Sequence, residues 1–338
     1  MKCKLDPIQS FHRPSPAFTK ADQLLCIEDA QLTGKRAWNG LLNIGRCLFL
    51  DRADRAATTF LLSSGRSGST WLGSALHSLP DTRMVFEPFH ARSGVPSLSP
   101  YRYRYIPPES DDGLVAAGLI SLLAGSSWNP WIEQFNPVGK LTYHRRLVKE
   151  VRINLLLPFL LKQFHDCRFI LLMRHPAAVA QSQNRLGWNL EPERLLEQSG
   201  LDGVSWMPDM RKLRLSDDLF ERNLAFWAIE NRIAIDAAQK AAIPIVFYEE
   251  VCIDPASQLA RLETYLGTKF PESALDGMAE VSWSTDKSIS AYSVQEKVSA
   301  WQSRVRSSQI NAMLRILEST GLDQVYGRDV LPNSTIAR

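Results

Sequence analysis

Short apolar segments alternate with longer segments of helical periodicity along most of the chain. The short segments predict buried strands at residues 58–62, 84–86, 147–151, 168–173 and 243–247. Between and after them, apolar residues recur at helical spacing over 70–79, 114–123, 153–164, 177–186, 219–242 and 309–319. This alternation predicts an α/β fold, in which helices cover both faces of a parallel β-sheet.

The first part of the chain has a different pattern. Ala21–Ala30 and Trp38–Leu50 carry apolar residues at helical spacing, so residues 1–57 are predicted to form a helical N-terminal extension. Residues 58–328 are predicted to form one α/β domain, and residues 329–338 a tail. The stretch from Gly187 to Arg214 is interpreted as an insertion over the sheet that contacts substrate.

Composition narrows the class of protein. The 338 residues have 45% hydrophobic content and a formal net charge of +3, which does not indicate a nucleic-acid partner. The five cysteines lack the spacing of a zinc site or a disulfide framework, and we expect no metal. Because the N-terminal residues do not resemble a secretory signal and no window is apolar enough to span a membrane, a soluble, cytoplasmic protein is expected.

The loop that follows the first predicted strand of the sheet has the composition of an anion site. In a parallel sheet, such a loop brings backbone amides and a helix N-terminus to one point, which favours phosphate or sulfate. Gly65 and Gly68 permit a tight turn, and Arg66 adds a planar cation. Hydroxyl donors come from Ser67, Ser69 and Thr70. A Ser/Gly surface turn is the alternative, and the absence of a loop lysine disfavours an ordinary ATP- or GTP-driven P-loop enzyme.

A second element begins where the strand at 168–173 ends. Arg174 follows this strand, Pro176 occupies the first turn of the next helix, and Ser182 lies about two helical turns further on. An arginine at the carboxyl end of a strand lies at the sheet edge where α/β proteins bind ligands. Pairing of this arginine with a helix carboxylate is the alternative interpretation.

Taken together, these two elements resemble the sulfotransferases that use 3′-phosphoadenosine 5′-phosphosulfate (PAPS). Residues 64–72, including Trp71, look like the family's 5′-phosphosulfate loop, in the arginine form similar to its carbohydrate and bacterial branches. Arg174 and Ser182 stand where the family binds the 3′-phosphate, although His175 replaces the usual aspartate and Ala177 a frequent arginine. The resemblance covers residues 58–327 and implies PAPS as co-substrate, bound by Arg66, Ser67, Gly68, Ser69, Thr70, Trp71, Arg174 and Ser182.

A third element follows the predicted strand at 84–86. Glu87 lies in a Glu-Pro context similar to that of the proposed base of carbohydrate sulfotransferases, and His90 is the rival candidate. Lys149, on an otherwise apolar strand, looks similar to a lysine segment in carbohydrate members, although a salt bridge with Glu150 or a neighbouring helix is the simpler interpretation. The resemblance implies Glu87 and Arg66 as catalytic residues. His144 is assigned instead to an exposed basic turn at 143–146.

The resulting hypothesis is transfer of a sulfuryl group from PAPS to a hydroxyl of a carbohydrate or glycolipid. A P-loop-like kinase or NTPase and a catalytically silent nucleotide-binding scaffold are the alternatives. Tryptophans in the poorly patterned regions are candidates for stacking on sugar rings, or equally for the core: Trp128, Trp131, Trp188 and Trp206.

Overall fold

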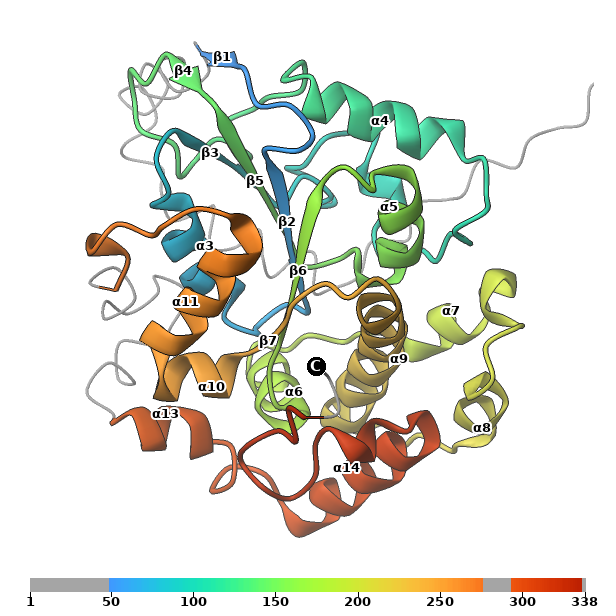
Figure 1. The fold of residues 1–338 in the computed structure, drawn as a ribbon. Coiled ribbons are helices and arrows are strands. Elements are labelled where there is room, and N and C mark those ends of the chain that lie inside the picture. Colours follow the sequence, from blue (N-terminus) through green and yellow to red (C-terminus); the bar gives the residue numbers. More distant parts are fainter. Residues whose placement is uncertain (1–48, 276–292, 336–338) are drawn as a thin grey trace, which may run out of the picture.

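A computed structural model describes residues 49–275 and 293–335, and its centre is a parallel β-sheet (Figure 1). In this part of the chain the sheet has the strand order β3-β5-β2-β6-β7, and all neighbouring pairs are parallel. This arrangement confirms the predicted fold class. The strands are β2 (Thr58–Ser63), β3 (Thr82–Phe86), β5 (Arg145–Glu150), β6 (Arg168–Met173) and β7 (Ile245–Phe247).

Alternate residues of each strand enter two different apolar cores, one on each face of the sheet. In β2, Phe60 and Leu62 belong to one core and Leu61 to the other, as the two-residue period of a strand requires. One face is covered by α4 (Gly113–Leu123), α5 (Leu157–Gln163), α6 (Pro176–Arg185), α9 (Leu219–Lys240) and α14 (Ser307–Thr320). The other is covered by α3 (Ser69–His77), α10 (Tyr248–Ile253) and α11 (Pro255–Leu266), seen to the left of the sheet in Figure 1.

The helix boundaries follow local chemistry. Asp254 caps α11 by accepting a hydrogen bond of 3.0 Å from the Ser257 amide, and Gly267 ends the helix in the left-handed region at φ 66°. The 187–214 segment folds into short helices beside α9. The remaining elements are β1 (Leu50–Asp51), β4 (Thr142–Tyr143), η1 (Ser99–Tyr101), η2 (Asn154–Leu156), α7 (Pro192–Leu196), η3 (Ser199–Leu201), α8 (Met207–Lys212), α13 (Val294–Ser299) and η5 (Leu322–Gln324).

The start of the described chain differs from the predicted helical extension. Leu50, expected at the end of a helix, lies in strand β1, which pairs with β4. Asp51 then accepts hydrogen bonds of 2.8 Å from both Arg83 and Arg146, and all three side chains are buried. This ionic contact ties residue 51 to the sheet domain. The helix at 21–30 and residues 38–48 of the second helix lie outside the described residues.

One further local prediction is corrected. His144 is exposed as expected, but Tyr143 and Arg146 are buried in or beside the sheet rather than in an exposed turn. The late strand ends at Phe247, as predicted, and Tyr248 begins α10. Among residues 49–275 and 293–335, no helix has the length and apolar composition needed to cross a bilayer.

Candidate functional site

The three elements singled out in the sequence lie along one edge of the sheet, where its parallel strands end. Reading across the sheet, these ends are occupied by Glu87 after β3, Arg152 after β5, the 64–68 loop after β2, Arg174 after β6 and Tyr248 after β7. The loop therefore lies at the centre of the edge. This position is where ligands bind in open α/β sheets.

The loop after β2 has the backbone of an anion site. Arg66 and Gly68 adopt positive φ angles of 78° and 88°, and Gly68 is the N-cap of α3. Within the described chain, the amides of Gly68, Ser69 and Thr70 donate to no protein acceptor. The fully buried hydroxyl of Ser67 likewise has no partner among the described residues. Unpaired donors at a helix N-terminus can bind an anion.

Both loop glycines are required by close neighbours. A Cβ atom at Gly65 would lie 2.8 Å from the Trp188 ring, and one at Gly68 would lie 2.5 Å from the Tyr248 ring. The loop backbone is therefore packed between two aromatic side chains. At Gly68 the positive φ adds a second reason for glycine.

The second element contacts the loop directly. Arg174 donates from Nη1 to the Arg66 carbonyl at 3.1 Å, and Arg66 donates from Nε to Ser182 Oγ at 3.2 Å. The structure thus brings together the sequence-predicted residues Arg66, Arg174 and Ser182. Two guanidinium groups and the helix N-terminus of α3 concentrate positive potential at one place.

Tyr248 is a further candidate site residue, which the sequence analysis missed. Its ring lies 4.3 Å from the Arg174 guanidinium carbon and packs edge-on against Trp71, with ring centroids 5.6 Å apart. The signal was its position directly after the last predicted strand, at the edge where ligands bind.

His175 caps the N-terminus of α6, at the position where the PAPS-dependent sulfotransferases that the sequence resembles usually have aspartate. Its Nδ1 accepts the Ala177 amide at 3.3 Å, so Nε2 carries the proton and donates to the Gly327 carbonyl at 3.2 Å. The ring stacks on Trp301, with centroids 4.1 Å apart. Burial lowers the pKa of His175 to about 3, so the imidazole is neutral. A neutral cap thus joins α6 to the C-terminal segment.

Glu87 lies in a buried ionic cluster rather than as an isolated carboxylate. It has a positive φ of 44°, and its two carboxylate oxygens accept hydrogen bonds from Lys149 Nζ and, at 2.8 Å, from Arg152 Nη1. Burial alone would raise the pKa of Glu87, but the two cations outweigh it and hold the pKa well below its usual range. Glu87 is therefore ionised at neutral pH.

The remaining candidates of this region have partners that bear on their roles. Lys149 pairs with Glu87 rather than with Glu150, which contacts Arg152 at 3.3 Å. His90 is buried and packs on Trp131, and its Nδ1 accepts the Ser93 amide at 3.1 Å. Because that acceptor nitrogen is already used, His90 is the poorer candidate for a base.

The four tryptophans considered for sugar stacking have different environments. Trp188 and Trp206 are buried, whereas Trp128 is 56% exposed. Trp131 is partly exposed and donates from Nε1 to the carbonyl of Glu87 at 3.3 Å. Trp131 is thus the tryptophan that contacts the candidate catalytic residue directly.

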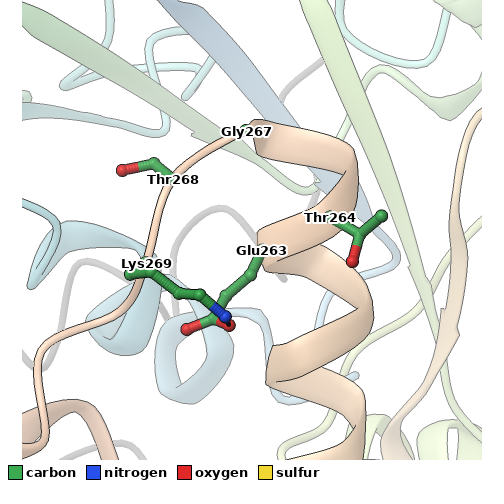
Figure 2. Close-up of a pocket in the computed structure, with 5 residues that line it drawn as sticks. All are labelled: Glu263, Thr264, Gly267, Thr268 and Lys269. Carbon is green, nitrogen blue, oxygen red and sulfur yellow. Dashed lines mark hydrogen bonds and ion pairs between the residues drawn. The ribbon is translucent and has the colours of Figure 1, made fainter.

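A surface pocket elsewhere does not belong to this site. Figure 2 shows Glu263, Thr264, Gly267, Thr268 and Lys269 lining a hollow at the C-terminal end of α11. Arg145, the first residue of β5, donates to Thr268 there, which places the hollow at the opposite end of the strands from Arg66 and Arg174. Among the described residues, no group of three or more His, Cys, Asp or Glu side chains could hold a metal ion.

Comparison with known proteins identifies the family. No curated protein matches the chain. Among solved structures, the chain is similar to the sulfotransferase domain of the Synechococcus PCC 7002 olefin synthase, with 19% identity, coverage of 78% of this chain and 93% of that one, and a TM-score of 0.43. It is also similar to mouse sulfotransferase SULT7A1 complexed with PAP, with 15% identity, coverage of 79% and 86%, and a TM-score of 0.41. Residues 59–272 match the model of the sulfotransferase family, and the chain therefore belongs to that family.

Proposed function

We propose that this sulfotransferase binds PAPS across the loop after β2 and the start of α6, and transfers its sulfuryl group to a hydroxyl of a carbohydrate or glycolipid. The observation that carries the proposal is the direct contact of Arg66 with Ser182 and of Arg174 with the Arg66 carbonyl. A nucleotide with phosphate groups at both its 3′ and 5′ positions needs two cationic sites at a fixed separation. The two elements supply them side by side.

In the proposed complex, the 64–70 loop and Arg66 hold the 5′-phosphosulfate, while Arg174 and Ser182 hold the 3′-phosphate. The amides of Gly68, Ser69 and Thr70 and the hydroxyl of Ser67 would donate to the phosphosulfate oxygens. Trp71 and Tyr248, in edge-on contact, offer apolar faces beside Arg174 for the nucleotide base.

The proposed transfer breaks the sulfur–oxygen bond to the 5′-phosphate and forms a sulfur–oxygen bond to the acceptor. The bridging oxygen keeps the bonding electron pair, and the cationic Arg66 would stabilise the charge that develops there. The hydroxyl proton passes to Glu87 and then to solvent. By analogy with phosphoryl transfer, the transition state is loose, so positioning and charge stabilisation dominate.

A carboxylate that is paired with two cations, as Glu87 is, is a weak base. A loose transition state requires no stronger base. The acceptor oxygen becomes acidic only as its bond to sulfur forms, so the proton leaves late and needs no strong base. Lys149 lies between Glu87 and α3. Its Nζ donates to Glu87, and its Cγ lies 3.7 Å from where a Cβ atom at Gly73 of α3 would be. We assign Lys149 to the sulfuryl oxygens, towards which it would turn as Glu87 takes the proton.

The carbohydrate or glycolipid acceptor is supported by the arginine form of the loop and by Glu87 at the end of β3. The Trp131 ring beside Glu87 adds an aromatic surface of the kind on which sugar rings stack. A labelled-PAPS screen of sugar, glycolipid, phenol and steroid hydroxyls tests the class. Labelling of phenols or steroids but not sugars would overturn the acceptor assignment.

Nucleotide choice is tested separately from acceptor choice. Isothermal titration with adenosine 3′,5′-bisphosphate, ADP and magnesium-ATP should show tight binding of the bisphosphate alone. Binding of magnesium-ATP alone would favour a kinase or NTPase. Bisphosphate binding without sulfate transfer to any acceptor would favour a catalytically silent scaffold.

A further inference from the structure

A buried carboxyl group lies behind the candidate nucleotide loop and has no role in the proposed transfer. Glu230, in the middle of α9, is 3% exposed, and its Oε1 accepts a hydrogen bond of 2.5 Å from Ser64 Oγ. Ser64 directly follows β2 and is the first residue of the loop. The contact therefore joins the central helix of one sheet face to the first residue of the anion-binding segment.

The neighbouring residue Asn231 completes a network around the same hydroxyl. Its Nδ2 donates to Ser64 Oγ at 2.7 Å and to the Trp227 carbonyl at 2.8 Å. Asn154 Nδ2 in turn donates to Asn231 Oδ1 at 3.2 Å. The Ser64 hydroxyl is thus fixed in both its donor and its acceptor role, which orients the backbone where the loop begins.

Among the described residues, no cation lies in an ion pair with Glu230 to balance a negative charge. Within the described chain it forms no ion pair, and its second oxygen, Oε2, is buried without a partner. Burial raises the pKa of Glu230 to about 8, against the smaller opposite effect of the Ser64 hydrogen bond. The carboxyl group is therefore mainly neutral at pH 7.

The charged side chains of the elements packed against α9 do not provide a counter-ion for Glu230. None of them is paired with Glu230. Lys162 is paired with Glu109, Glu193 with Arg222 and Arg315 with Glu221. Ser64 lies two residues before Arg66, so Arg66 is the charged residue nearest to Ser64 in the sequence. The charged groups concerned are Lys162, Arg168, Arg185, Glu193, Arg194, Arg315 and Glu318.

We propose that Glu230 is a positioning residue that holds the 64–70 loop through Ser64 while it is a neutral acid, and that its ionisation weakens nucleotide binding. The inference rests on the proposed binding of the nucleotide by this loop. A negative charge on Glu230 would lie in a low-dielectric interior behind amides that bind phosphate, so it would repel the ligand. The same charge would also disturb the loop that Ser64 anchors.

The test is titration of adenosine 3′,5′-bisphosphate into wild type, Glu230→Gln and Asp236→Asn between pH 7.5 and 9.5. Glutamine keeps an acceptor for Ser64 but cannot ionise. Asp236→Asn is the matched control, because it replaces a partly exposed carboxylate of the same helix that pairs with Arg232 at 2.9 Å. The wild-type and Asp236→Asn dissociation constants should rise about tenfold over this range, and that of Glu230→Gln less than about twofold.

Glu230→Ala supplies the second measurement. It should raise the bisphosphate dissociation constant at pH 7.5 while leaving the KM for the acceptor unchanged, and adding Ser64→Ala should produce no further loss. Parallel pH dependence in wild type and Glu230→Gln would overturn the inference while leaving the proposed nucleotide site intact. Absence of bisphosphate binding by wild type at every pH would instead overturn the proposed function, and this inference with it.

Discussion

Arg66 Nε donates a hydrogen bond of 3.2 Å to Ser182 Oγ, so the loop after β2 and the helix after β6 meet through two side chains. Their sequence positions are more than a hundred residues apart. Ser182 can accept this bond because it lies in the second turn of α6, on the side that faces the loop. The two halves of the proposed nucleotide site therefore act as one unit.

Mutations of Arg66 and Ser182 should consequently be non-additive. Arg66→Ala should reduce kcat/KM by about a hundredfold to a thousandfold, the effect of losing one charge-stabilising donor in a transition state. Ser182→Ala should weaken bisphosphate binding, and the double mutant should lose less than the sum by about 1 kcal/mol. Strict additivity in a double-mutant cycle of dissociation constants would contradict a shared unit.

Arg174 should determine recognition of the 3′-phosphate. Arg174→Ala should weaken binding of adenosine 3′,5′-bisphosphate by about 10- to 100-fold, because a charge-assisted hydrogen bond contributes about 1.5–3 kcal/mol. Binding of adenosine 5′-monophosphate should change much less. Calorimetry with both nucleotides checks this, with Arg168→Ala as a control at the opposite end of β6. Equal losses for both ligands would place Arg174 elsewhere.

Glu87 should show the influence of its two cations in the pH profile. Because Lys149 and Arg152 hold its pKa low, the acid limb of kcat/KM due to Glu87 should lie well below neutral pH. Lys149→Met removes one cation, so that limb should move towards neutral pH while kcat falls. Glu87→Gln should abolish the limb and most of the activity. Activity of Glu87→Gln equal to wild type would exclude Glu87 as the proton acceptor.

His175 should make the free energy of unfolding depend on pH in the acid range. Its folded-state pKa of about 3 lies below the ordinary histidine value, so the unfolded chain binds a proton that the native chain excludes. The contribution is fully present above about pH 7 and declines by about 1.4 kcal/mol per pH unit between about pH 6.5 and the folded-state pKa of about 3. His175→Gln should flatten this slope in urea unfolding. An unchanged slope would show that other groups produce it.

The two loop glycines should respond differently to alanine. Gly65→Ala is opposed only by the Trp188 ring, so adding Trp188→Leu should restore much of the bisphosphate binding. Gly68→Ala is opposed by the Tyr248 ring and also by its φ of 88°, so adding Tyr248→Ala should not restore binding. Thermal unfolding of each variant gives the control for general destabilisation. Full rescue at Gly68 would show that steric contact alone matters there.

The sequence alone predicted the sheet, most helices and the positions of the residues after β2, β3 and β6. It could do so because local signals suffice for these features: alternation and apolar runs define buried strands, and Pro176 and Gly267 mark helix boundaries. Strand β1 was missed because two residues carry no periodicity. Its pairing with β4 and the buried contacts of Asp51 depend on partners more than thirty residues away.

What only the tertiary structure decided is which side chains meet. The sequence determined that Arg66, Glu87 and Arg174 each follow a strand, but not that Arg66 contacts Ser182 or that Lys149 and Arg152 neutralise Glu87. It also gave no sign that Glu230 lies behind the loop, because a glutamate in a long helix looks like a solvated residue. Strand order and helix packing set these distances, and burial sets the charge states, so neither can be obtained from local sequence.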